Sequence, residues 1–198
     1  MKKLISAALG AALLIAPLSN AKAEAVEYEF DTVHSQIIFF VDHLGFAKSE
    51  GEFLHFDGGF TFDPENVEAS SVDVTIDTSS ISLDDEKWDA HMKNADFFDV
   101  EKYPTMTFKS TGIEKTSENT GKLTGDLTML GQTHPVTLDV KMNKVGTHPR
   151  SGNQHAGFSA TGTLNRSQWG MEYGLPMVGD EVEMRIEVEA SKKTEMNP

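Results

Sequence analysis

Cysteine is absent from the 198-residue chain. Its absence excludes disulfide bridges and every reaction or metal site that depends on a thiolate. Positive charge is also scarce, because 17 basic residues stand against 31 acidic ones and the net charge at pH 7 is −14. Such a surface repels nucleic-acid phosphates and anionic lipid headgroups, so nucleic-acid binding is excluded as a function.

Long hydrophobic runs are missing except at the amino terminus. There a positively charged start precedes the apolar run 4–18, and Ala21-Lys22-Ala23 places small residues where a signal peptidase reads them. The run is short for a membrane-spanning helix, which needs about 20 apolar residues. The order of features therefore predicts a cleaved secretory signal over residues 1–23. We expect a periplasmic protein without stable membrane insertion.

The remaining residues, 24–198, have the length of one domain. Removing the signal takes away three lysines and no acid, so the expected net charge falls from −14 to −17. The absence of any linker or internal repeat favours a single domain over the whole of this range.

Catalytic motifs are absent as well. The chain contains no G-x-S-x-G, H-E-x-x-H, P-loop or G-x-G-x-x-G pattern, and its seven histidines never lie two to five residues apart, the usual metal-ligand spacing. We therefore predict no enzymatic activity, no cofactor and no metal site. His43 has the parity of an inward-facing strand position. A structural hydrogen bond, a contact with a ligand headgroup and a metal-ligand role stay open for it.

The sequence is rich in alternating apolar and polar residues. The alternation is clearest over 72–77, 136–142 and 182–189, and turn residues separate these short runs from their neighbours. This pattern predicts an all-β fold in one antiparallel sheet, closed or nearly closed. Residues 83–94 break the pattern and predict one short helix crossing an end of the barrel. Ser82 is the predicted N-cap, because acids follow it in the first turn.

Two apolar side chains do not fit the alternation. Ile38 and Phe40 lie side by side on the outward parity of their strand. They predict either a contact with a second subunit in a homodimer or ordinary isolated apolar residues on the surface.

Ordered motifs cover nearly all of residues 26–190. They include Asp31-Thr32-Val33-His34-Ser35, His43-Leu44-Gly45, Gly51-Glu52-Phe53, Tyr103-Pro104-Thr105-Met106-Thr107-Phe108 and Val178-Gly179-Asp180-Glu181-Val182. In this order and at these spacings the chain resembles the YceI-like proteins, bacterial periplasmic barrels associated with polyisoprenoid binding. The resemblance implies an extended eight-stranded antiparallel lipocalin-like β-barrel with one short helix and a long apolar cavity. It also implies a carrier of a long-chain isoprenoid or related lipid, and it carries no catalytic residue.

The candidate ligand-binding residues combine inward-facing strand positions with residues at the expected rim. They are Ile37, Phe39, Val41, His43, Phe53, Met106, Phe108, Met129, Leu138, Phe158, Ala160, Arg166 and Trp169. We expect His43 or Arg166 to contact the headgroup. Trp169 is expected either to pack downward from a glycine-rich loop or to form part of a lid. The alternative to a lipid carrier is a stress-related interaction protein whose barrel is filled by its own side chains.

Overall fold

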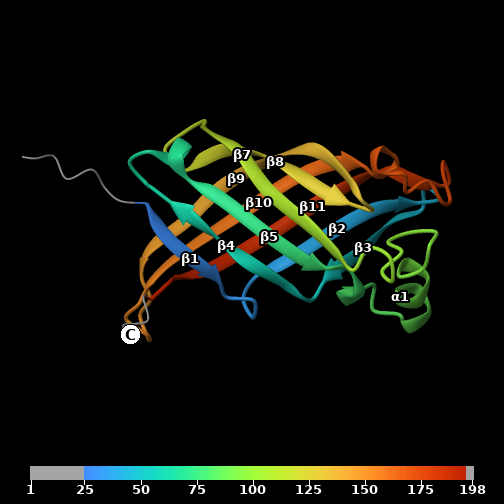
Figure 1. Ribbon diagram of the computed structural model, residues 1–198, viewed down its shortest axis with the longest axis horizontal. Helices are drawn as coiled ribbons and strands as arrows, with labels where there is room; N and C mark the ends of the chain where they lie inside the picture. Colours follow the sequence, from blue (N-terminus) through green and yellow to red (C-terminus); the bar gives the residue numbers. More distant parts are fainter. Residues whose placement is uncertain (1–24, 195–198) are drawn as a thin grey trace, which may run out of the picture.

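The protein is described by a computed structural model covering residues 25–194, so the predicted signal peptide lies outside the described residues. It is a closed, all-β antiparallel barrel of eight strands with one α-helix at one end (Figure 1). The strand segments are β1 (Val26–Phe30), β2 (Gln36–His43), β3 (Ala47–Phe53), β4 (Phe56–Phe62), β5 (Ser71–Asp77), β6 (Ile81–Ser82), β7 (Thr105–Lys115), β8 (Thr120–Met129), β9 (Gln132–Thr147), β10 (Gln154–Asn165) and β11 (Val178–Lys192). The helices are α1 (Glu86–Met92) and the 3-10 turns η1 (Val67–Ala69), η2 (Thr78–Ser80) and η3 (Arg166–Trp169).

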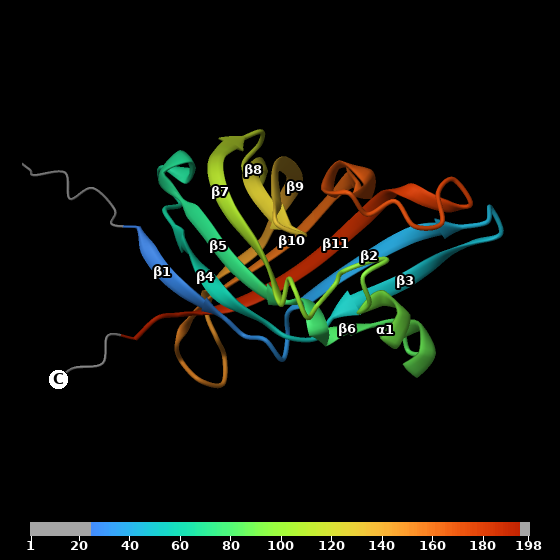
Figure 2. The same cartoon turned by 45° about the vertical axis from the view of Figure 1, so that its right-hand side comes forward.

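The eleven segments make eight strands because three of the strands are interrupted. The ring runs β1-β4-β5-β7-β8-β9-β10-β11, and β1 pairs back onto β11 to close it. Segment β2 continues β1 along the first half of β11. Segment β3 pairs with β2 and continues β4, and β6 pairs with β3 and continues β5. Figure 2 shows this prolonged wall reaching toward the end that carries α1. The predicted eight-stranded barrel is confirmed.

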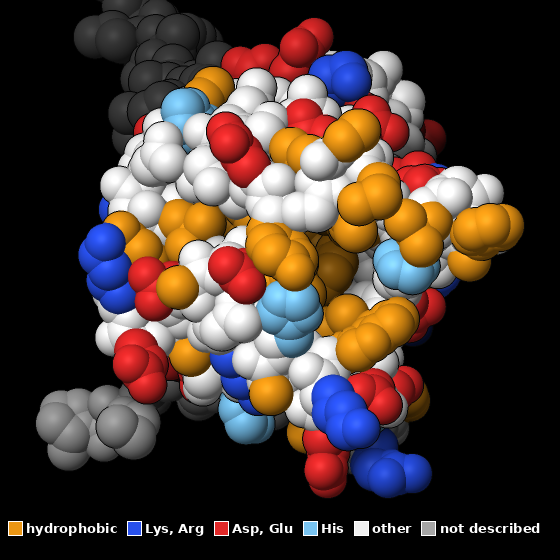
Figure 3. All heavy atoms as spheres, turned by 90° about the vertical axis from the view of Figure 1, so that its right-hand side faces the viewer, with side chains coloured by type: hydrophobic (Ala, Val, Ile, Leu, Met, Phe, Trp, Pro, Cys, Tyr) orange, Lys and Arg blue, Asp and Glu red, His pale blue; other side chains and the backbone are white. Residues whose placement is uncertain are grey.

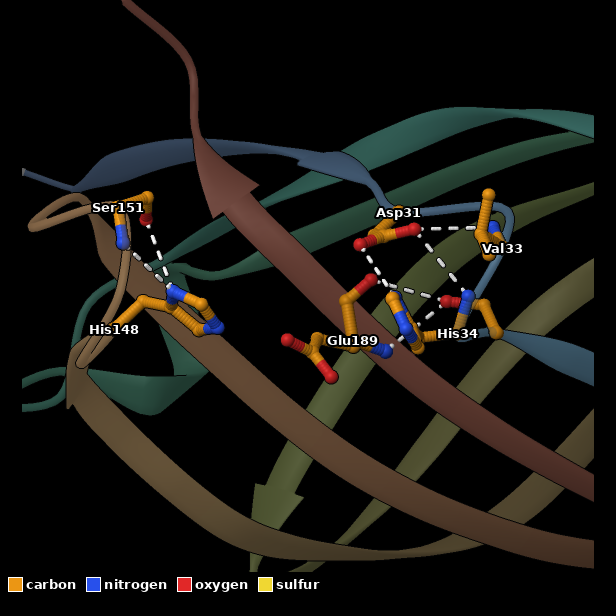
Figure 4. A network of polar contacts seen from close by, with 7 residues as sticks. Asp31, Val33, His34, His148, Ser151 and Glu189 are labelled. Carbon is orange, nitrogen blue, oxygen red and sulfur yellow. Dashed lines mark hydrogen bonds and ion pairs between the residues drawn. The ribbon is translucent and has the colours of Figure 1, made fainter.

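The interruption between β1 and β2 is a hydrogen-bonded corner (Figure 4). The Asp31 carboxylate accepts from the backbone N–H of Val33 at 3.0 Å and of His34 at 3.3 Å, and lies 2.8 Å from His34 Nδ1. Ser35 Oγ donates to the Glu189 carbonyl and accepts from the Glu189 N–H, both at 3.0 Å. The motif Asp31–Ser35 therefore docks a bend of the backbone onto β11.

This corner makes one pH-dependent prediction. The hydrogen bond with Asp31 and the negative charge of its carboxylate raise the pKa of the exposed His34 imidazole above its ordinary value. Because the folded pKa is the higher one, the added stability is present below about pH 6.5, the unfolded value, and is lost as pH rises through the folded pKa. Asp31→Asn is expected to return the His34 pKa toward its ordinary value, as measured by NMR titration. Asp73→Asn removes an exposed charge elsewhere and should leave His34 unchanged; equal His34 titration curves in wild type and Asp31→Asn would contradict the assignment.

The helix begins later than the sequence suggested. Asp85, not Ser82, is the N-cap, and its carboxylate accepts from Lys87 N at 3.0 Å and Trp88 N at 3.1 Å. Ser82 instead ends β6, where it pairs with Glu52. The prediction of Ser82 was wrong because strand pairing continues to that residue, and the chain can turn only after it, through Asp84 at φ 58°.

Buried side chains form two clusters inside the barrel. The larger cluster lies toward α1, where Phe53 meets Phe98 edge-on with ring centroids 5.4 Å apart. The smaller one centres on Tyr28, Phe62 and Ala190, where β1 begins and β11 ends. Members of both clusters line the cavity described next.

Ile38 and Phe40 are half-buried on the outer face. Charged residues flank them across the sheet: Ile38 is paired with Glu52 and Arg185, and Phe40 with Glu50 and Glu183. A homodimer through this strip stays a prediction.

Candidate ligand-binding cavity

A cavity of about 570 Å³ runs inside the barrel. Its size falls within the range of about 300–1,000 Å³ that is usual for sites holding one small ligand. Its wall is mainly aromatic and aliphatic, with inward-facing side chains from all eight strands. Seen from the α1 end, Figure 3 shows a hollow with hydrophobic side chains around its rim. The alternative of a barrel filled by its own side chains is therefore wrong.

The predicted site residues converge on this cavity, with one exception. Those that line it are Ile37, Phe39, Val41, His43, Phe53, Met106, Phe108, Met129, Leu138, Phe158, Ala160 and Arg166. All of them except Arg166 lie on strands, where inward positions of neighbouring strands share one side of a closed sheet. Their contact with a ligand stays a prediction.

Trp169 is the exception. Its side chain is buried outside the cavity lining, its Nε1 donates to the Leu127 carbonyl at 3.1 Å, and its ring meets His134 edge-on at 5.1 Å. It packs η3 against the β8–β9 hairpin, so its inclusion among the ligand-binding residues is corrected. A buried indole needs a partner for its N–H, and the Leu127 carbonyl supplies one.

Arg166 also has a different role from the expected one. Its guanidinium is buried and donates to four backbone carbonyls: Nε to Gly179 at 2.8 Å, Nη1 to Met171 at 2.9 Å, and Nη2 to Tyr173 at 2.9 Å and Val178 at 3.1 Å. Burial lowers the pKa of Arg166, and the charge of Asp180 opposes that shift. Four of its five N–H donors are thus committed to the loop between η3 and β11. Arg166 clamps this loop instead of offering its charge to a headgroup.

The cavity stays open because large side chains fold against the wall. Three glycines leave gaps beneath them: the Phe39 ring lies over Gly51, the Phe108 ring over Gly125, and Leu138 over Gly162. A Cβ on Gly162 would lie 2.7 Å from Leu138 Cδ2, and one on Gly51 or Gly125 would collide with the aromatic ring. The sequence did not assign these glycines the role of seating a neighbouring side chain, because only the strand register shows which residue each one faces.

Gly51→Ala is expected to push the Phe39 ring off the wall and into the cavity. The expected loss is about 1–3 kcal/mol in the free energy of unfolding, the usual cost of overpacking, together with weaker ligand binding. Gly112→Ala is the matched control, because a Cβ there meets nothing within 4 Å. Urea unfolding compares the two; equal unfolding midpoints would show that Gly51 is not needed to seat Phe39.

The mouth of the cavity carries two imidazoles. His43 ends β2 with its ring centroid 6.2 Å from that of Trp88, and His91 on α1 lies 5.2 Å from the Tyr173 ring. These contacts join α1 to β2 and to the clamped loop. His91 was missed as a site residue because the position of the helix over the barrel cannot be derived from its sequence.

Two further features bear on what the site can hold. Within residues 25–194 no group of three or more His, Cys, Asp or Glu side chains is placed to bind a metal ion. Over the same residues, the only α-helix is far too short to cross a membrane.

Comparison with known proteins identifies relatives along most of the chain. The profile of the YceI-like domain matches residues 28–190. A UPF0312 protein of Pseudomonas putida strain GB-1 is 40% identical over 196 residues, covering 98% of this chain and 99% of the relative.

Solved structures share the architecture. A YceI protein of Campylobacter jejuni superposes with a TM-score of 0.71 at 32% identity, covering 77% of this chain and 90% of that one. A domain of Saccharophagus degradans, described as polyisoprenoid-binding and implicated in plant cell wall breakdown, gives a TM-score of 0.64 at 12% identity, covering 85% and 99%. At that identity the second likeness shows the fold alone.

Proposed function

The chain belongs to the YceI-like domain family, and from this membership we propose that it is a non-catalytic carrier of a long-chain amphiphilic lipid such as a polyisoprenoid. The apolar tail occupies the barrel cavity, and the headgroup lies at the mouth beside His43 and His91. The signal-like residues 1–23 support a periplasmic location for this carrier.

The open apolar cavity is the observation that carries the proposal. Its lining offers many surfaces for van der Waals contact, and the methionines among them adapt to a flexible chain. The polyisoprenoid-binding description of the Saccharophagus degradans domain supports the same class of ligand on this fold.

The energetics favour long chains. Each buried methylene contributes roughly 0.8 kcal/mol, so ten of them contribute about 8 kcal/mol. Association costs about 4–15 kcal/mol, so short ligands bind weakly and affinity rises with tail length until the cavity is filled. We therefore expect selection by length and shape, with the mouth imidazoles discriminating among headgroups.

Native mass spectrometry of the purified protein, followed by organic extraction, tests the proposal. The expected result is a complex with one lipid of defined mass. Protein that carries no lipid and binds none of a series of isoprenoid alcohols of increasing length would overturn it.

The two tryptophans provide an independent titration. Trp88 lines the mouth, whereas Trp169 lies outside the cavity. Added ligand should change the fluorescence of the wild type, and Trp88→Phe should remove most of that change while binding persists in mass spectrometry.

A further inference from the structure

Exposed apolar side chains concentrate around the mouth. Of the seven large hydrophobic residues that are exposed within residues 25–194, five come from the three segments that border it: Leu44, Phe46, Trp88, Tyr173 and Met177. We call these five residues the apolar collar. Phe46 and Met177 are 89% and 63% exposed, and neither lines the cavity. Figure 3 shows hydrophobic side chains projecting around the hollow at this end.

The collar is held in place by the fold. Leu44 N donates to the Met177 carbonyl at 2.9 Å, which joins the β2–β3 hairpin to the loop before β11. The Arg166 guanidinium holds the same loop through the Tyr173 and Val178 carbonyls. The backbone that carries the collar is thus held in place, although the collar side chains are exposed. The barrel does not need this exposed apolar surface for its own packing, so the surface points to an external partner.

We propose that the apolar collar docks onto the surface of a phospholipid bilayer and so presents the mouth of the cavity to the lipids. The docking gives the proposed carrier its route of loading and release, and in that sense it rests on the proposed function. The contact itself depends only on the collar.

The distribution of charge favours a bilayer over a second copy of the chain. Residues 43–47 and 173–179 contain no Asp, Glu, Lys or Arg, although such residues make up 24% of the chain and its net charge is −14. Trp88 lies between Lys87 and Asp89 on α1, so the uncharged part of the collar is the hairpin and the loop. These two segments can enter the headgroup region of a membrane while the acidic body stays in water. A dimer through the collar would instead bring two acidic bodies together.

The residue types agree with this choice. Trp88 and Tyr173 combine an aromatic face with a polar edge, the combination that is enriched at membrane–water interfaces. Phe46 and Met177 add apolar tips that gain from leaving water. The collar therefore suits shallow, reversible contact with lipid headgroups and the first part of the acyl chains.

Flotation with phosphatidylcholine vesicles tests the inference. The wild type should float with the vesicles, and Phe46→Glu with Met177→Glu should weaken that binding by about tenfold or more, because both tips then carry a charge into the interface. Val33→Glu with Leu54→Glu is the matched control: it adds the same two charges at exposed apolar residues outside the collar and should float like the wild type. All variants share one amino terminus, so residues 1–24 contribute equally.

Each outcome decides a separate point. A collar variant that no longer floats but keeps its melting temperature and its lipid in mass spectrometry supports docking. If the glutamate pair unfolds the protein, Phe46→Ser is the milder substitute. Its vesicle binding should lie between that of the wild type and that expected for the glutamate pair. No flotation of the wild type, equal loss in the control, or a wild-type dimer that the collar variant dissociates would overturn the inference. Collar-dependent flotation of a protein that never carries lipid would leave docking in place and remove the proposed function.

Discussion

Ala160→Trp is expected to weaken binding of a long-chain lipid strongly while leaving the barrel folded. Ala160 lies on β10 between Val140 and Ile186, and its Cβ faces the cavity. A tryptophan side chain buries about 150–250 Å² of surface, and here it would occupy the space that the lipid tail needs. We expect the affinity to fall by about a hundredfold, equivalent to roughly three lost methylenes of contact. The fluorescence titration with isoprenoid alcohols measures it.

Thr161→Trp is the matched control for that variant. Thr161 is the next residue on the same strand and is exposed on the outer face. The same bulk added there should leave affinity unchanged. If both variants bound lipid equally well, the ligand would have to lie outside the barrel, and the cavity would not be the binding site.

Arg166→Ala is expected to have the largest effect on stability. It removes four hydrogen bonds from a buried, charged donor and leaves the carbonyls of Met171, Tyr173, Val178 and Gly179 without it. Losing such a network costs on the order of 3–5 kcal/mol, a large part of the stability of a single domain. The free energy of unfolding from urea titration measures the loss.

Two further arginine variants locate the cause. Arg166→Lys should recover only part of the loss, since an ammonium lacks the planar fork that reaches four carbonyls at once. Arg185→Ala removes an exposed arginine that pairs with Glu187 at 3.1 Å, and should cost about 0–1 kcal/mol. A similar loss from Arg166→Ala and Arg185→Ala would contradict the role of Arg166 as a clamp.

Periodicity predicted an antiparallel sheet, closed or nearly closed, and the inward strand positions, whereas the eight strands and the cavity were expected from the family resemblance. Side chains alternate faces strictly along a strand, so Leu138 and Ala160 could be assigned inward without knowing the register. The closure could not be read in detail, because it depends on β11 pairing with both β1 and β2 around the corner at Asp31–Ser35. A motif of polar residues gives no sign by itself that it bends a strand.

The misplaced residues share a physical cause. Arg166 and Trp169 lie in a region without regular alternation, and their partners are backbone carbonyls that a sequence does not distinguish. Ser82 was a reasonable N-cap by type, but strand pairing with β3 prevailed over local helix preference. Composition and spacing therefore do not predict the role of a residue whose partners are backbone groups.

The position of β11 bears on how the molecule is made. This last strand pairs with β10 on one side and with β1 and β2, the first segments of the described chain, on the other. Its contacts with β1 and β2 span most of the sequence, and such long-range pairing forms slowly. The barrel cannot close until β11 has left the ribosome, so β1 and β2 wait for their partner while the intervening strands are being synthesised. That delay suits the export route predicted from residues 1–23, in which a polypeptide threads through a secretion channel before it folds.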